Sequence, residues 1–250
     1  MNIFNNNKML KTYKQPYKLK GNYNPVIPLK IFQTWYTKDL PPKMKQTVDN
    51  LKASHPRFEH YLFDDNDCRE FIKNHFDSDV LNAYDCLIPG AYKADLWRCC
   101  VLYIHGGIYM DIKLRCINGF HLIELTENNH FVKDRDPPLT IYNALMVSQK
   151  GNPFLWKAIW RIVINVKKRF YGRNPLEPTG PWMLGKILLR NGIRQNIDLQ
   201  HYQGGGYIIY KNRFIISTEY PEYNRERSET YKNIKTKRYS DLWHERKIYK

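Results

Sequence analysis

The sequence lacks the cysteine pattern of a disulfide or zinc framework. Its 250 residues include five Cys, an odd number, and no two of them form a C-x-x-C pair. We therefore expect neither a disulfide-stapled secreted domain nor a zinc site built on paired cysteines. Cys99 and Cys100 are adjacent within an apolar run. This placement is typical of small core residues in a reducing compartment.

Long apolar segments are also missing. No run reaches the roughly 18 apolar residues of a membrane span, and Met1 to Lys20 contain no apolar stretch of a signal peptide. We expect no transmembrane anchor, with peripheral membrane contact left open, and a cytoplasmic location. Richness in Lys, Asn, Ile and Tyr is typical of an AT-rich genome, such as that of a virus, protist or bacterium. For a virus, the expected location is the host cytoplasm or the virion.

Acidic residues are scarce in particular segments. The formal charge is +16. Residues 1–24 hold five Lys and no acid, residues 153–174 six bases and no acid, and residues 222–250 nine bases and five acids. The rest of the chain is nearly neutral, which argues against a general nucleic-acid-coating surface. Hydrophobic residues make up 42% and aromatics 14%, so the chain can build a real core.

The first third of the chain alternates strand-like and helix-like segments. Lys30–Trp35 is rich in β-formers, Met44–Ser54 is helical in pattern, and Phe58–Phe63 is a second strand. Asp64 to Asp67 then supply an N-cap for a helix that extends to about Asn74. This succession predicts an α/β fold with a mainly parallel central sheet flanked by helices. Further along we expect a strand at 140–148, helices from 151 and 179, and a hairpin over 207–218.

The most informative segment is Ala91 to Asn118. Apolar residues at spacings of three and four predict a helix over Ala91–His105, and Gly106 followed by Gly107 ends it. A strand is predicted over Ile108–Lys113.

Charged residues of this segment have two interpretations. Asp95 and Arg98 are three apart and share one helix face, so they form either a surface ion pair of little value or part of a site. The period of a strand places Tyr109, Asp111 and Lys113 on one face, opposite the apolar residues. An acid at the carboxyl end of a buried strand needs a partner, and ligands bind at such strand ends.

Three blocks of this chain resemble glycosyltransferase family 32. They are Ile27–Trp35, Lys93–Arg98 and Gly106–Asp111, and Thr179–Pro181 adds a short T-G-P element. That family includes proteins similar to yeast initiating mannosyltransferases, and the large clostridial glucosylating toxins share its ordered blocks. The resemblance covers roughly residues 25–185.

The resemblance implies a GT-A fold and a retaining hexosyltransferase. Its donor would be a nucleotide-diphosphate sugar, with UDP-sugars favoured over GDP-sugars. We expect residues 1–24 to be a basic tail and residues 25–250 a single glycosyltransferase domain. The donor-binding half would span about 25–120, and the acceptor side with a C-terminal lid about 121–250.

Residue roles follow from the resemblance by position. Trp35 would stack on the nucleobase in a pocket lined by Gln33 and Thr34, although such a Trp is more often plain core. Asp95 would hydrogen-bond donor-sugar hydroxyls. The rest of the expected donor site is Arg98 at the diphosphate or sugar oxygens, Tyr109 beside the diphosphate, and Asp111 at the ribose and donor sugar.

The third position of the D-x-D motif departs from the family. Family members carry a second Asp that binds Mn²⁺ or Mg²⁺, whereas this chain has Asp111-Ile112-Lys113. A charged lysine has no lone pair for a hard cation. In one interpretation, Lys113 itself stabilises the leaving diphosphate and is a catalytic residue together with Asp111 and Arg98. In the other, Asp111 holds a cation with the phosphates and another group, or the activity has been lost.

The second half of the chain offers acceptor or lid candidates. These are Asn143, Gly180, Trp243 and His244. The acceptor could be a glycan, a lipid or a protein, in keeping with a role in carbohydrate biosynthesis, and no specific nucleic acid is expected. The alternative is a non-catalytic protein of the same fold that binds polyanions, either nucleic acid or an anionic glycan, through its basic segments.

Overall fold

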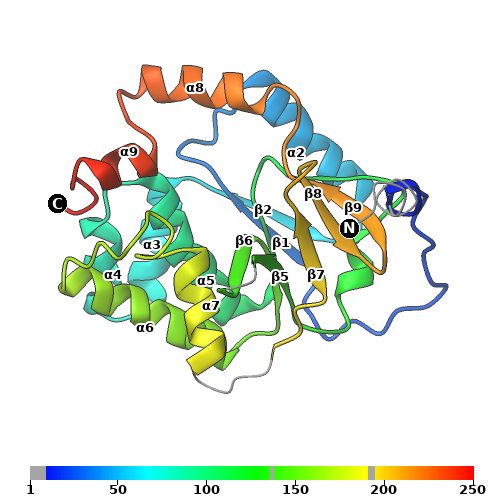
Figure 1. Cartoon of the computed structure of the whole chain (residues 1–250), viewed down its shortest axis with the longest axis horizontal. Helices are drawn as coiled ribbons and strands as arrows, with labels where there is room; N and C mark the ends of the chain where they lie inside the picture. The colour runs from blue at the N-terminus through cyan, green and yellow to red at the C-terminus, as the bar shows by residue number, and fades with distance from the viewer. Residues whose placement is uncertain (1–9, 136–137, 191–194) are drawn as a thin grey trace.

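A computed structural model describes residues 10–135, 138–190 and 195–250. These residues form one mixed sheet of nine strands with helices packed around it (Figure 1). The strand order is β2-β1-β3-β6-β5-β7-β8-β9-β4. The strands are β1 (Lys30–Thr34), β2 (Glu59–Phe63), β3 (Gly107–Met110), β4 (Arg115–Cys116), β5 (His130–Arg135), β6 (Thr140–Ser148), β7 (Leu199–Tyr202), β8 (Tyr207–Tyr210) and β9 (Arg213–Ser217).

The helices at 42–54, 65–75, 90–105, 153–167 and 181–190 occur where the sequence predicts them, whereas those at 78–86, 223–233 and 239–244 were not expected. The N-cap Asp64 and Asp67 form a reciprocal capping box at the start of the helix that follows β2. The helices are α2 (Pro42–Ser54), α3 (Asp65–His75), α4 (Ser78–Cys86), α5 (Gly90–His105), α6 (Pro153–Lys167), α7 (Pro181–Arg190), α8 (Tyr223–Asn233) and α9 (Tyr239–His244), with a 3-10 turn η1 at Leu122–Leu125.

The sheet combines a parallel part and a larger part that is mostly antiparallel. β1 pairs in parallel with both β2 and β3, as the alternation of strands and helices predicts. β3 and β5 are both antiparallel to β6, and β7, β8, β9 and β4 continue with antiparallel pairs. The α/β class is confirmed, but a mainly parallel sheet is wrong beyond β3. Short turns and hairpins, rather than helical crossovers, connect most of the later strands, and only β5 and β7 pair in parallel there.

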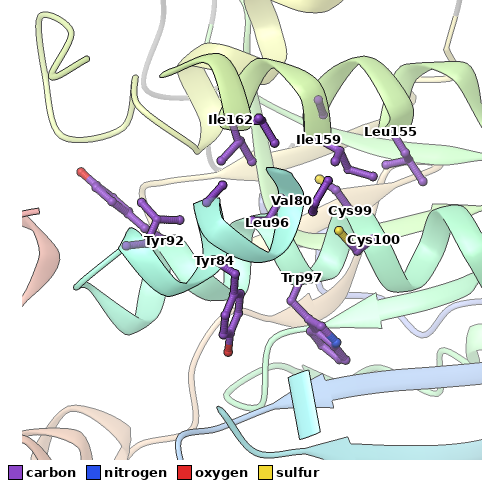
Figure 2. Close-up of a cluster of buried hydrophobic side chains, with 14 of the residues drawn as sticks. Val80, Tyr84, Tyr92, Leu96, Trp97, Cys99, Cys100, Leu155, Ile159 and Ile162 are labelled. Atoms are coloured by element: carbon purple, nitrogen blue, oxygen red, sulfur yellow. The ribbon is translucent and has the colours of Figure 1, made fainter. Parts of the chain in front are cut away.

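The main core lies between the sheet and helices α3 to α7. Figure 2 shows Leu155, Ile159 and Ile162 of α6 directed toward Leu96 and Cys99 of α5. Cys99 and Cys100 are fully buried thiols, which confirms their expected role as small core residues. This packing fixes α5, and with it the functional residues that α5 carries.

The strand expected over Ile108–Lys113 ends at Met110. Gly106 adopts a φ of 65° at the end of α5, which is the left-handed conformation expected at a helix C-terminus. The backbone N–H of Asp111 then donates to the carbonyl of Ala144 at 2.7 Å, and a turn follows. Lys113 is therefore placed by a turn and not by the alternation of a strand.

Part of the expected basic tail packs against the domain. Tyr17 is buried, and its hydroxyl donates to the buried carboxylate of Glu124 at 2.8 Å. The hydroxyl of Tyr23 and the backbone N–H of Lys20 donate to the same carboxylate. Residues 10–24 thus form an arm attached to the domain, because Tyr17 and Tyr23 supply hydrogen bonds that the buried Glu124 carboxylate requires. Residues 1–9 lie outside the described part of the chain.

Candidate functional site

A cavity of about 230 Å³ opens where strands β1 and β3 end. Its walls include Thr34 and Trp35 at the end of β1, Tyr109 of β3 and Asp111 just after it, and Arg98 from α5. The carboxyl ends of the parallel strands thus carry the cavity, as expected for an open α/β sheet. Residues of α8 and α9 cover it from the other side.

The floor of this cavity rests on a buried carboxylate. The Asp95 side chain accepts hydrogen bonds from Asn143 Nδ2 at 2.9 Å and from Thr179 Oγ1 at 2.7 Å. Nη2 of Arg98 lies 3.4 Å from the same carboxylate. Burial raises the pKa of the Asp95 carboxyl, while the positive charge of Arg98 and the two hydrogen bonds act in the opposite direction.

Arg98 is held on every side. Its guanidinium donates to the carbonyl of Asn143 at 2.6 Å and to that of Ala94 at 3.1 Å, and its plane lies 4.3 Å from the centre of the Tyr109 ring. Burial alone would lower the pKa of Arg98, but neighbouring Tyr109 and Asp111 outweigh this effect and the pKa is raised. Arg98 is therefore a fixed, permanently charged group at the cavity wall.

Asp111 joins this network at the rim. Its Oδ1 accepts a hydrogen bond from the Tyr109 hydroxyl at 2.7 Å and lies 3.5 Å from Nη1 of Arg98. Burial raises the pKa of Tyr109, so its phenol stays a hydrogen-bond donor. The Asp111 side chain remains 25% exposed, which leaves carboxylate surface for a ligand.

Lys113 also lines the cavity. Its ammonium lies 3.6 Å from Glu219 Oε1 and 5.4 Å from the centre of the Tyr223 ring. Its side chain is 18% exposed. The residue that replaces the second Asp of the motif therefore adds a positive charge to the same wall as Arg98.

The residues around Asp111 do not fit a divalent cation. Among the residues that the structure describes, no group of three or more His, Cys, Asp or Glu side chains is placed to hold a metal ion. Arg98 lies 3.5 Å from Asp111, and the other charged residues that line the cavity are Asp65, Lys113 and Lys237. Three cations and two carboxylates make a poor ligand set for Mn²⁺ or Mg²⁺.

The three candidates at the end of β1 divide between two environments. Thr34 and Trp35 line the cavity, and Nε1 of Trp35 is buried with no hydrogen-bond partner among the described residues. Gln33 is fully buried away from the cavity, where its Oε1 accepts a hydrogen bond from Nε2 of His60 at 2.7 Å. The expectation that Gln33 lines the pocket is wrong, since successive strand residues point to opposite faces.

Asp95, Asn143 and Gly180 lie beneath the cavity wall. Both Asp95 oxygens are engaged inside the protein, so this carboxylate does not line the cavity as expected. A Cβ on Gly180 would lie 3.2 Å from Asp95 Oδ2, which explains why a glycine follows Thr179. Asn143 and Gly180 are thus support for Asp95 and not a lining of the cavity.

The C-terminal segment covers the cavity with residues that the sequence did not single out. Trp243 instead donates from Nε1 to the carbonyl of Tyr171 at 2.6 Å, and exposed His244 packs against it; neither lines the cavity. The spacing of the tyrosines, eight residues apart within a charged segment, was the available signal. The covering residues are Tyr223, Tyr231, Ile234, Thr236, Lys237 and Tyr239.

The described residues include no helix with the length and apolar character required to cross a membrane.

Comparison with known proteins agrees with this geometry. Residues 41–132 match the family described as "Glycosyltransferase sugar-binding region containing DXD motif". The chain is 32% identical over 143 residues to inositol phosphoceramide mannosyltransferase 3 of Schizosaccharomyces pombe, covering 57% of this chain and 39% of that protein. It is 33% identical over 93 residues to the uncharacterized glycosyltransferase L373 of Acanthamoeba polyphaga mimivirus, covering 36% of this chain and 37% of that protein.

The fold has a relative among solved structures. The PaToxG glycosyltransferase superposes with a TM-score of 0.51 at 18% identity, covering 75% of this chain and 76% of that one. The chain spans about two fifths of the length of the curated relatives named above. The structural likeness confirms the expected GT-A fold. The resemblance seen in the sequence is also confirmed, since residues 41–132 match the family of the glycosyltransferase sugar-binding region containing the DXD motif.

Proposed function

We propose that the protein transfers a hexose, with retention of configuration, from a nucleotide-diphosphate sugar to an acceptor. The observation that carries this proposal is the cavity wall at which Arg98, Asp111 and Lys113 meet. Two fixed cations beside one carboxylate suit a diphosphate bound next to a sugar hydroxyl. UDP-sugars are the preferred donors and GDP-sugars the next candidates.

The chemistry required is stabilisation of a leaving group. In glycosyl transfer the bond from the anomeric carbon to the diphosphate oxygen breaks, and negative charge builds on the departing nucleoside diphosphate. Arg98 and Lys113 supply positive charge there without reorganising, because Arg98 is locked by two carbonyls and Lys113 is held by Glu219. We assign to Lys113 the positive charge that a divalent cation supplies in family members with two aspartates.

The other residues take supporting roles. Asp111 receives a donor hydroxyl, oriented by the hydrogen bond from Tyr109. Asp95 positions Arg98 rather than touching the sugar, since both of its oxygens are already hydrogen-bonded. Trp35 offers a ring face and an unpaired indole N–H to the nucleobase.

Donor binding tests the proposal directly. The full chain is screened by thermal shift against UDP- and GDP-sugars, with Mn²⁺ and with a chelator, and then assayed for sugar hydrolysis and transfer. We expect one donor to raise the melting temperature with the chelator present, and Asp111→Asn to abolish that shift. If no nucleotide sugar binds under either condition, the proposal fails and a non-catalytic polyanion-binding protein is favoured.

The acceptor is proposed from the relatives. Three Schizosaccharomyces pombe proteins that match this chain are named inositol phosphoceramide mannosyltransferases. A glycolipid or glycan acceptor is therefore tested first, and a protein acceptor second.

A further inference from the structure

A basic and apolar surface lies on the outer side of α6 and the adjoining α7. Four large apolar side chains are exposed there, at 40% for Trp156, 37% for Ile164, 39% for Phe170 and 64% for Leu189. They are half of the eight large hydrophobic residues that are exposed in the described part of the chain. Ile164 and Phe170 line one hollow, and exposed apolar side chains that lie together mark an interaction site.

The fold does not need these side chains for its core. The opposite side of α6 carries Leu155, Ile159 and Ile162, which are fully buried against α5 (Figure 2). Trp156 and Ile164 both lie on α6 and remain partly exposed, with the ring of Trp156 centred 5.1 Å from that of Tyr103 of α5. Their apolar surface therefore remains available after folding.

Positive charge accompanies the apolar side chains. Residues 153–174 contain six bases and no acid. Arg161 and Lys168 line a hollow of about 310 Å³ together with Ile164, Phe170 and Lys186. Lys186 is paired with Glu177, whereas neither Arg161 nor Lys168 forms an ion pair with a residue that the structure describes. We call the set Trp156, Arg161, Ile164, Lys168, Phe170 and Leu189 the α6–α7 face.

We propose that the α6–α7 face docks the protein on an anionic membrane surface. A helix side with Trp, Phe and aliphatic residues, rimmed by Lys and Arg, matches the physics of an interfacial helix, in which apolar groups enter the headgroup region and cations meet lipid phosphates. Nucleic acid fits less well, because two of the four apolar side chains, Ile164 and Leu189, have no ring on which a base could stack and bring only aliphatic surface.

The docking face is separate from the donor cavity. The cavity is lined by the start of α5 and by α8 and α9, whereas the face lies on α6 and α7, which Figure 1 shows well apart from α8. The proposal goes beyond the proposed enzymatic function and does not depend on it, since vesicle binding requires no donor.

Vesicle binding is the test. The full chain is sedimented with phosphatidylcholine vesicles containing either no anionic lipid or about 30% phosphatidylserine. We expect binding only to the anionic vesicles, and weaker binding as salt is raised. At about 1 kcal/mol per cation, Arg161→Glu with Lys168→Glu should weaken binding at least about 30-fold. Ile164→Ser with Phe170→Ser should also weaken it, at unchanged charge.

A matched control separates the face from total charge. Arg225→Glu with Lys232→Glu makes the same change of charge at exposed positions of α8. This variant should keep vesicle binding near that of the parent chain, and melting curves should show that each variant is folded. Equal loss in both charge variants would mean that net charge alone drives binding and would overturn the proposal.

Contact with lipid is read independently by fluorescence. Brominated lipids should quench the tryptophan emission of the parent chain, and Trp156→Phe should remove a clear part of that quenching. Quenching that is unchanged by this substitution would place another surface on the membrane. A single-stranded oligonucleotide serves as a competitor. If the protein binds the oligonucleotide and does not bind vesicles, the face is a nucleic-acid site and the membrane proposal is wrong.

Discussion

The floor and the roof of the cavity are built in opposite ways. The floor, formed by Arg98 and Asp111 with the buried Asp95 beneath them, is a network held by hydrogen bonds within the protein. The roof consists of residues of α8, of α9 and of the segment between them, with Tyr231 and Tyr239 half-buried, Tyr223 buried and Lys237 exposed. Both regions face the same space.

The difference concerns preorganisation. Side chains that are locked before a ligand binds stabilise developing charge without a cost of reorganisation, so the floor suits the chemical step. Half-exposed aromatic residues at the end of the chain adapt to a ligand and exclude water from it, so the roof suits binding and closure. Substitutions in the floor should therefore alter stability and chemistry together, and those in the roof only binding.

The largest effect is expected for Arg98→Ala. It removes the cation that faces Asp95 and Asp111, which leaves buried charge unpaired and lowers the free energy of unfolding by about 3–5 kcal/mol. Donor-dependent transfer should be lost as well. Urea denaturation and a transfer assay measure the two losses. Arg69→Ala, which breaks a partly exposed ion pair with Asp85, is the matched control and should cost less than about 1 kcal/mol.

Substitution of Lys113 tests whether its positive charge takes the place of a metal ion in the cavity. Lys113→Ala should lower the transfer rate by about 10²–10³-fold, as for loss of one fixed group at developing charge, with little change in stability. Lys113→Asp recreates the second aspartate of the motif and should make activity depend on added Mn²⁺. The rates are compared with Mn²⁺ and with a chelator. A parent enzyme that is already inactivated by the chelator would contradict the assignment.

His60 of β2 is a partly buried group that does not line the cavity. Burial lowers its pKa from 6.5 to about 4 in the folded protein. Above pH 6.5 the imidazole is neutral in both folded and unfolded chains; as the pH falls toward 4, only the unfolded chain takes up the proton. The free energy of unfolding should therefore drop by about 2–3 kcal/mol over that range.

His60→Gln isolates this contribution. Glutamine can still donate to Gln33 and does not titrate, so denaturation between pH 7 and pH 4 should show a shallower loss of stability than in the parent chain. Transfer at neutral pH should stay unchanged, because neither Gln33 nor His60 lines the cavity. A change in donor affinity in this variant would show that the Gln33–His60 pair influences the cavity, contrary to this expectation.

The smallest effect is expected in the roof. Tyr231→Ala removes one ring from the cavity cover and should raise the dissociation constant of the donor by about 2–10-fold, the worth of a single aromatic contact. Melting temperature should hardly move. Tyr231→Phe keeps the ring and should bind the donor almost normally, as measured by calorimetric titration. Loss of several kcal/mol of stability in Tyr231→Ala would show that the roof is as rigid as the floor.

Local patterns predicted most elements that surround the site. The apolar spacing of α5 and the glycines after it predicted this helix. The capping residues Asp64 and Asp67 predicted the helix after β2. The antiparallel half of the sheet was missed, because strand direction depends on which distant segment pairs with which. The partnership of Asp95 with Thr179 spans 84 residues, and no local spacing encodes it.

The sequence by itself determined which chemical groups the protein has available. It placed Asp95 and Arg98 on one helix face, put Asp111 in the strand-like segment that follows, and put a lysine where relatives have an acid. Only the tertiary structure decided what these groups do. It directed Asp95 inward, gave Lys113 its place at the cavity through a turn, and covered the cavity with tyrosines from the C-terminal helices. The reason is that burial and long-range pairing set the protonation, orientation and access of a side chain, and none of these is a property of its neighbours in sequence.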